Sequence, residues 1–102
     1  MSLSARERGE LSVQTRVARS MLRRDLKRGL VRIADVLDEP PDSLRGVLLF
    51  DVALMAPYCG ARRLERIGFE ACAARINLAQ PVDAAPLRAR SWLAQRLQRR
   101  GR

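Results

Sequence analysis

The fold is set by the segment LRGVLLFDVALMAPYCG, residues 44–60. Its first part, residues 44–56, is the most apolar run in the chain, and we expect it to form the central core helix. Pro57 cannot continue a helix and Gly60 favours a turn, so residues 57–60 predict a tight turn that leads into another helix. The centre of the fold is therefore predicted to be a helical hairpin.

Helical segments are predicted on both sides of this hairpin, and no segment has the pattern of a strand. The run after Leu11 is free of Pro and Gly as far as Arg28, and Gly29 is the expected stop. The further predicted helical segments are residues 31–37, ended by the prolines at 40 and 41; residues 61–67, ended or kinked at Gly68; residues 69–78; and residues 87–100.

Length and composition agree with a small helical protein. A chain of 102 residues forms one domain, and an aromatic content of 4% argues against a β-sandwich or barrel. We therefore expect an all-α fold with a flexible N-terminus over residues 1–10 and a single domain over residues 11–100. That domain would consist of a long basic helix, residues 11–29, and a compact core, residues 30–100.

Several chemistries are absent from the sequence. There is no histidine, so the usual general base and the commonest metal ligand are missing. Cys59 and Cys72 do not have the spacing of a zinc or redox motif, and we expect buried or inert thiols. No apolar run approaches the roughly 20 residues of a membrane span, and no signal peptide is apparent. The predictions are a cytoplasmic protein that is not an enzyme and needs no cofactor or metal.

The charge points to a polyanionic partner. The chain has 20 Lys and Arg against 11 Asp and Glu, a net charge of +9, and all but one of the basic residues are arginine. Nucleic acid is the first expected partner and an anionic membrane surface the second.

The predicted first helix concentrates this charge. Arg16, Arg19, Arg23 and Lys27 fall within about 80° on a helical wheel. Between residues 16 and 28 the only acid is Asp25, so pairing within the helix cannot neutralise the basic side chains. We expect these side chains to contact phosphates; the alternative is a solvated charged face. Val13, Val17 and Met21 lie on another side, which is expected to face the core together with Leu22, Leu26 and Leu30.

The turn at residues 57–60 is the second candidate. It would expose backbone N–H groups at a helix N-terminus, where Gly60 allows close approach and Arg62 and Arg63 add positive charge. Tyr58 is a candidate for a hydroxyl–phosphate contact, and the alternative is a plain corner between helices. Trp92 is expected to pack in the core.

Three stretches resemble the actinobacterial integration host factor family of nucleoid-associated proteins. Arg24–Gly29 (RDLKRG) is similar to the end of the family's first helix, Val36-Leu37 to the pair before its acidic loop, and Leu49–Gly60 to its block around the turn proline. The resemblance covers roughly residues 16–97. It implies a long N-terminal helix followed by a helix–two-turns–helix domain, in a divergent or phage-borne member.

The resemblance also implies a function: largely sequence-nonspecific binding of double-stranded DNA, with bending or compaction, in the nucleoid. Gly60, Arg62 and Arg63 would clamp phosphates, and Arg88 and Arg90 would stand for the arginines ahead of the last helix. Arg45 stands alone where the family has several basic residues. A recombinase or integrase on the same DNA is a candidate partner, and we expect a monomer with no small-molecule substrate. The candidate DNA-contacting residues are Arg16, Arg19, Arg23, Arg24, Lys27, Arg28, Arg45, Tyr58, Gly60, Arg62, Arg63, Arg88 and Arg90.

Two alternatives stay open. An RNA-binding protein would prefer duplex RNA in a direct competition with duplex DNA. A small phage factor that docks an acidic host protein would bind nucleic acid weakly and would leave the apolar run Val47–Met55 partly exposed.

Overall fold

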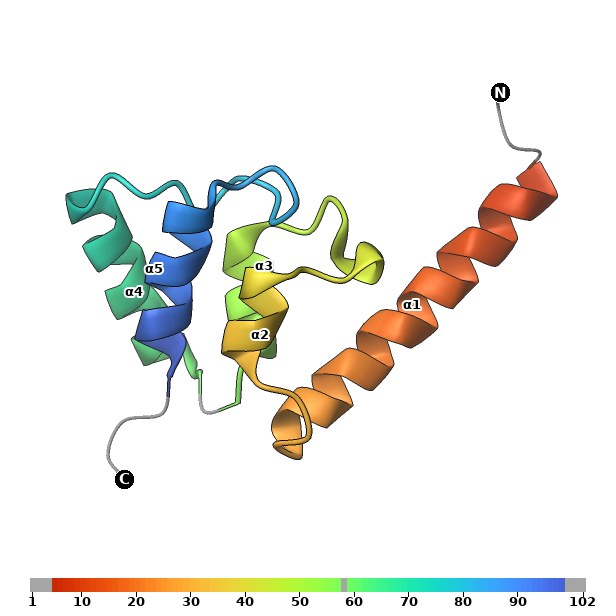
Figure 1. The fold of residues 1–102 in the computed structure, drawn as a ribbon, viewed down its shortest axis with the longest axis horizontal. Coiled ribbons are helices and arrows are strands. Elements are labelled where there is room, and N and C mark those ends of the chain that lie inside the picture. Colours follow the sequence, from red (N-terminus) through yellow and green to blue (C-terminus); the bar gives the residue numbers. More distant parts are fainter. Residues whose placement is uncertain (1–4, 58, 99–102) are drawn as a thin grey trace.

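The computed structural model describes residues 5–57 and 59–98, with side chains from residue 12 onward. Every regular element in these residues is a helix, which confirms the predicted all-α fold (Figure 1). An isolated antiparallel bridge joins Leu48 to Pro81. The elements are α1 (Ala5–Lys27), α2 (Ile33–Asp38), the short 3-10 helix η1 (Asp42–Leu44), α3 (Leu49–Met55), α4 (Ala61–Ala73) and α5 (Leu87–Leu97).

Helix α1 starts earlier than the sequence predicts. It begins at Ala5, within the N-terminal segment expected to be flexible, and not at Leu11. Residues 5–10 are mostly Ala, Arg and Glu, which are good helix formers. The destabilisation caused by the single Gly9 is too small to end the helix.

The predicted stop at Gly29 is confirmed. Gly29 has a φ of +75°, in the left-handed region, and follows the last turn of α1. Its amide donates to the Leu26 carbonyl at 3.2 Å, while the Leu30 amide donates to the Asp25 carbonyl at 2.9 Å. These two bonds form a Schellman motif, the ending that glycine at this position favours.

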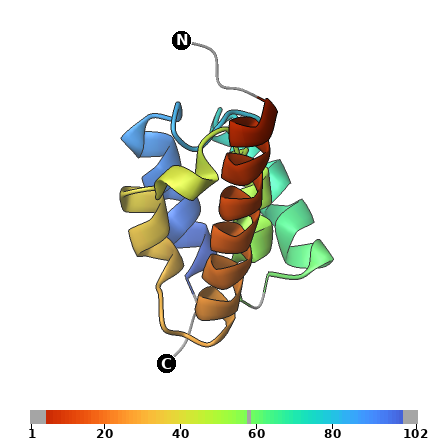
Figure 2. The same ribbon diagram turned by 90° about the vertical axis from the view of Figure 1, so that its right-hand side faces the viewer.

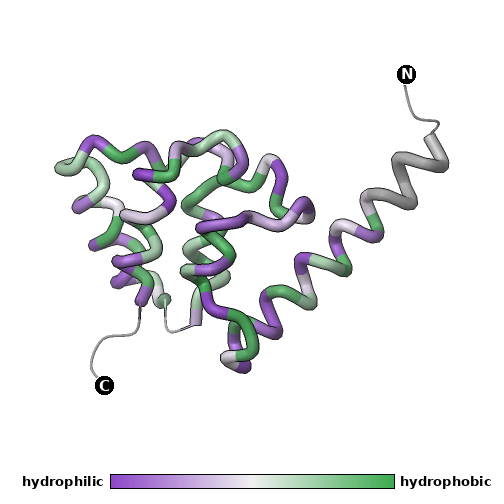
Figure 3. Tube along the Cα trace, in the orientation of Figure 1, coloured by the Kyte–Doolittle hydropathy of each residue, from purple (hydrophilic) through white to green (hydrophobic). Residues whose placement is uncertain are grey.

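Only the C-terminal part of α1 is anchored in the core. Leu26 is buried, Leu22 packs against the core, and α1 also contacts η1. Toward its N-terminus the helix diverges from the other helices (Figure 1), and Figure 2, viewed from that side, shows α1 in front of the body. Val13, Val17 and Met21 are therefore exposed, which corrects the prediction that they face the core. Figure 3 shows apolar positions recurring among polar ones along this projecting helix.

Helix α3 begins at Leu49 and not at residue 44, because distant residues pair with the segment before it. Gly46 has a φ of +82°, and its amide donates to Asp83 Oδ1 at 2.8 Å. The Val82 amide donates to the carbonyl of Val47 at 2.8 Å. These contacts keep residues 46–48 out of the helix, so the predicted core helix is shortened at its start.

Helix α3 has one side buried in the core and one side exposed to solvent. Leu49, Val52, Ala53 and Met55 are buried, as expected for the central helix, whereas Phe50 and Leu54 are exposed. The amides of Leu49 and Phe50 donate to the carbonyls of Gln80 and Leu78, each at 3.0 Å. The loop before α5 thus satisfies N–H groups that the first turn of a helix leaves without intrahelical partners.

Helix α4 is continuous from Ala61 to Ala73, so the predicted break at Gly68 is wrong. One glycine costs a helix only about 1 kcal/mol, and the buried side chains on both sides of it, Leu64, Ile67 and Ala71, offset that cost. The helix ends in a second Schellman motif, with Arg75 at a φ of 59° in the glycine position.

Helix α5 runs antiparallel to α4 and packs on α2 (Figure 1). Leu93 and Leu97 are buried in the core, whereas Leu87 is exposed at the start of the helix. Trp92 is partly buried and packs against the core, and the Arg96 guanidinium lies 5.1 Å from its ring centroid. The largest fully buried side chains come from all parts of the domain: Leu26, Leu37, Leu44, Leu49, Val52, Val82 and Leu93.

Candidate nucleic-acid interface

The inner side of α1 and the segment after η1 form a basic groove. Arg19 and Arg23 line it from α1, Arg45 lines it from the other wall, and its volume is about 380 Å³. Asp51 of α3 is the one acidic residue in the lining. The structure therefore brings Arg45 together with the predicted basic helix, although it lies far from that helix in sequence.

A second hollow continues along α1. Its lining consists entirely of hydrogen-bond donors on α1, three arginines and three hydroxyls, and its volume is about 630 Å³. Such a set suits phosphate oxygens, which accept hydrogen bonds from both guanidinium and hydroxyl groups. The hydroxyl residues were missed by sequence reasoning, although their spacing beside Arg16, Arg19 and Arg23 is a visible signal. They are Ser12, Thr15 and Ser20.

Arg19 is partly used by the fold itself. Its Nε atom donates to the Ser43 carbonyl at 2.6 Å, and Nη2 lies 3.4 Å from the Arg45 carbonyl. This arginine therefore holds α1 against η1 and shapes the groove. Arg16 and Arg23 remain exposed, and neither forms an ion pair with any side chain that the structure describes.

The C-terminal end of α1 lies beside the turn at residue 57. Lys27, Arg28 and Arg32 line a depression of about 510 Å³, together with Pro57 and the end of α5. Arg32 was missed because it falls in the predicted second helix, whereas it precedes the first residue of α2. The structure thus brings the basic end of α1 to the proline of the predicted phosphate-binding turn.

Gly60 is the residue before the first turn of α4. No side chain caps this helix start, and a Cβ atom at Gly60 would meet nothing within 4 Å. The free amides and the exposed Arg62 are compatible with an anion at this end. Tyr58, the other candidate in this turn, lies outside the described residues.

Arg63 has a structural role in the fold. Its Nη2 atom donates to the carbonyl oxygens of Arg96 and Gln98, both at 2.9 Å. It therefore satisfies backbone acceptors at the end of α5, where helix carbonyls lack intrahelical partners. Its predicted contact with phosphate stays a prediction.

Arg90 also binds the protein backbone. Its Nη1 atom donates to the carbonyls of Leu37 at 2.8 Å and Asp38 at 2.7 Å, and Nε donates to the Ala85 carbonyl at 3.2 Å. The half-buried guanidinium joins α5 to the end of α2, and its predicted DNA contact stays a prediction.

Arg88 is exposed at the start of α5, but far from the turn at Gly60. Helices α4 and α5 are antiparallel, so Arg62 and Arg88 lie at opposite ends of a helix about 20 Å long (Figure 1). The two turns that the family resemblance pairs on the DNA are therefore not neighbours on one surface. The outer side of α1 presents Arg24, which lies 3.9 Å from Asp25, and the turn after α1 presents the exposed Arg28.

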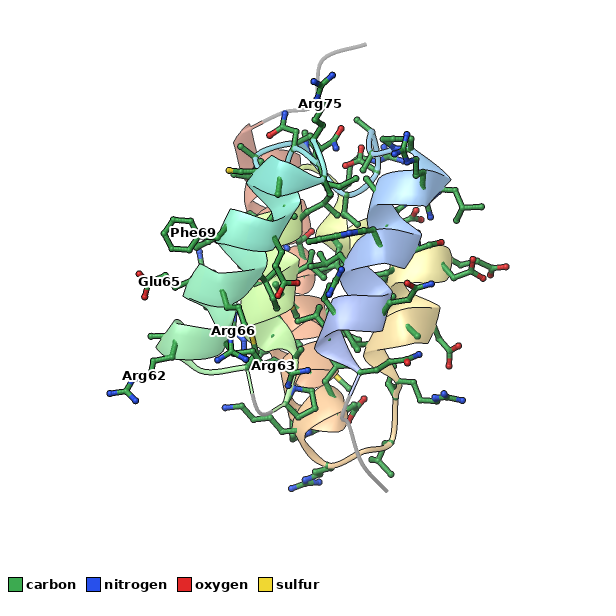
Figure 4. The ribbon with its side chains drawn as sticks, turned by 90° about the vertical axis from the view of Figure 1, so that its left-hand side faces the viewer. Arg62, Arg63, Glu65, Arg66, Phe69 and Arg75 are labelled. Carbon is green, nitrogen blue, oxygen red and sulfur yellow. The ribbon has the colours of Figure 1, made fainter. Side chains whose placement is uncertain are left out.

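The outer side of α4 and the end of this helix hold charged residues that the sequence reasoning missed, Glu65, Arg66 and Arg75. Figure 4 shows Arg62, Glu65 and Phe69 directed away from the body, and Arg75 at the far end of the helix. Arg66 is also exposed on α4. Because Glu65 lies among these arginines, the outer side of α4 is less uniformly basic than the inner side of α1.

Among the described residues, two titratable groups have a clearly shifted pKa, Cys59 and Asp83. Burial raises the pKa of the Cys59 thiol, and the charge of Arg63 only partly opposes that effect. Cys59 is half-buried and Cys72 is exposed, so burial does not account for Cys72, and its expected inertness stays a prediction. The described residues contain no group of three His, Cys, Asp or Glu side chains that could hold a metal ion.

The described helices include none that is both long enough and apolar enough to cross a membrane. Comparisons with family models, with curated proteins and with solved structures found no match. The resemblance to integration host factors, including the helix–two-turns–helix detail, therefore stays a prediction.

Proposed function

We propose that this chain binds double-stranded DNA, largely without sequence preference, along the inner side of α1, and that it acts as an architectural protein that bends or compacts DNA in the nucleoid. The observation that carries the proposal is the basic groove, where Arg23 of α1 faces Arg45 across a concave surface. The exposed Arg16 and Lys27 extend the same side of α1 in both directions.

The chemistry of this surface favours phosphate over bases. Guanidinium and hydroxyl groups dominate the two hollows, and phosphate contacts position a protein on DNA without reading its sequence. The net charge of +9 adds a long-range attraction to any polyanion. Specificity is therefore expected to be low and salt dependence high.

Fluorescence-anisotropy titration of a labelled duplex at several salt concentrations tests the proposal. If Arg16, Arg23, Lys27, Arg28, Arg45 and Arg62 each neutralise one phosphate, log Kd should rise against log salt with a slope of about 5. Arg23→Ala should lower that slope by about one, because one fewer counterion is released.

Arg88→Ala is the matched control, since it removes the same charge from an exposed position at the start of α5, outside the proposed binding surface. It should leave the slope unchanged. An equal loss for Arg88→Ala and Arg23→Ala would contradict the proposal, because total charge and not the α1 surface would then govern binding. A duplex RNA competitor that displaces the DNA at lower concentration than unlabelled DNA would favour the RNA-binding alternative.

A further inference from the structure

The outer side of α1 carries an uncovered apolar stripe. Val13, Val17 and Met21 follow one another at intervals of four residues and are 56%, 52% and 49% exposed. Side chains at this spacing lie in a line on one face of a helix. We call these three residues the α1 stripe. It points away from the chain's own body, because Leu22 and Leu26 on the opposite side make the contacts with the core.

The body carries an uncovered apolar groove between α3 and α4. Its lining includes Leu48, Phe50, Gly68, Ala71, Cys72 and Ile76, and its volume is about 470 Å³. We call it the α3–α4 groove. Phe50 lines the groove although it is 41% exposed, and Leu54 follows one turn later on α3.

One charged residue beside each surface is of opposite sign, Arg24 beside the α1 stripe and Glu65, which lies among the arginines of α4, beside the α3–α4 groove. Arg24 lies one turn beyond Met21 on α1, and its one ion pair with a described residue is a long one, 3.9 Å to Asp25. Glu65 is exposed on the outer side of α4, one turn from Gly68 in the groove wall, and pairs with no described side chain (Figure 4). An arginine at the end of an apolar ridge therefore matches a carboxylate beside an apolar groove.

We propose that the α1 stripe of one copy docks in the α3–α4 groove of a second copy, and reciprocally, to form a two-fold symmetric dimer. The stripe cannot reach the groove of its own chain unless α1 rotates and breaks the Arg19–Ser43 hydrogen bond. Pairing of two stripes with each other would leave both grooves open. Reciprocal docking covers both surfaces with one contact type, as in an isologous dimer.

This inference replaces the monomer expected from the sequence and does not depend on DNA binding. The inner side of α1, with Arg16, Arg19 and Arg23, is left uncovered by a partner that docks on the outer side. Each half of such a dimer would therefore keep its basic groove.

Sedimentation velocity of the full chain without DNA, from micromolar to millimolar concentration, tests the dimer. The wild type should approach twice its mass of 11.5 kDa. Val17→Asp and Phe50→Asp should each raise the dimer dissociation constant by at least about tenfold, because each buries a charge in the apolar contact. Leu30→Asp is the matched control: Leu30 is 71% exposed, lies in neither surface, and its change should leave the dimer intact.

A mixture of the two interface variants separates the proposed contact from other dimers. Val17→Asp retains an intact groove and Phe50→Asp retains an intact stripe, so the mixture should regain a heterodimer through one of the two contacts. Circular dichroism of each variant checks that it is folded. A wild type that stays monomeric throughout, or a dimer that Phe50→Asp leaves unchanged, would overturn the proposal.

Discussion

The Nη1 atom of Arg90 in α5 lies 2.8 Å from the carbonyl oxygen of Leu37 in α2. The same atom reaches the carbonyl of Asp38, so the guanidinium closes the C-terminal end of α2. α2 has only six residues and is too short to be stable in isolation, so its position depends on contacts of this kind with α5. A residue that resembles a phosphate ligand in the sequence is thus part of the scaffold.

Arg90→Ala should lower the free energy of unfolding by about 1.5–3 kcal/mol, because it removes hydrogen bonds from a charged, half-buried donor. Urea denaturation measures the change. Arg88→Ala removes the same charge from an exposed position two residues away and should change stability by less than about 0.5 kcal/mol. Equal stability of the two variants would show that the Arg90 contacts contribute nothing measurable.

Arg63→Ala should destabilise the chain by about 1–2 kcal/mol, since the carbonyls of Arg96 and Gln98 lose a shared donor. Its effect on the salt slope of DNA binding should be negligible. Arg62→Ala should show the reverse pattern, with little change in stability and a slope lowered by about one. Thermal unfolding and anisotropy titration of the two neighbouring variants separate a scaffold arginine from a surface one.

The contrast between the neighbouring Arg62 and Arg63 shows what could not be predicted from the sequence alone. Helical segments and the stop at Gly29 follow from local rules, because periodicity, proline and glycine act over a few residues. The start of α3 could not be predicted by these local rules. It depends on the hydrogen bond from the Gly46 amide to Asp83, which lies far from Gly46 in sequence. Arg62 and Arg63 are chemically identical, and only the approach of the end of α5 assigns one of them to the backbone.

The α1 stripe shows the same limit for apolar residues. Val13, Val17 and Met21 have the spacing of a core-facing side, and local pattern cannot tell a side that faces the chain's own core from a side that faces water or a partner. The direction in which α1 leaves the body is set by its contacts with η1, including the bond from Arg19 to Ser43. The candidate basic helix was predictable, whereas Arg45 as the opposite wall of its groove was not.

Asp83 should make stability depend on pH in the acid range. The hydrogen bond from the Gly46 amide lowers the pKa of the Asp83 carboxyl below its ordinary value. A folded-state pKa below the unfolded one stabilises the chain above about pH 4, and this contribution is lost as the pH falls through the folded-state pKa. Asp83→Asn keeps an oxygen but not the charge. Denaturant titrations should therefore show that wild type has a higher free energy of unfolding than the variant at pH 7 and that this difference disappears toward pH 2. A difference that does not change with pH would contradict the lowered pKa of Asp83.

Arg75 ends α4 in a conformation that glycine adopts more easily. A φ of 59° destabilises a residue with a Cβ atom by about 1–2 kcal/mol. Glycine avoids this strain, but it loses more conformational entropy on folding, which offsets part of the gain. Arg75→Gly should therefore raise the free energy of unfolding by up to about 1 kcal/mol.

Ala74→Gly is the matched control, because Ala74 has a φ of −86° in the ordinary helical region and gains nothing from glycine. It should lower stability by about 0.5–1 kcal/mol, so the same new residue at adjacent positions should shift the urea midpoint in opposite directions. Two shifts of the same sign would mean that the second Schellman motif does not form in solution.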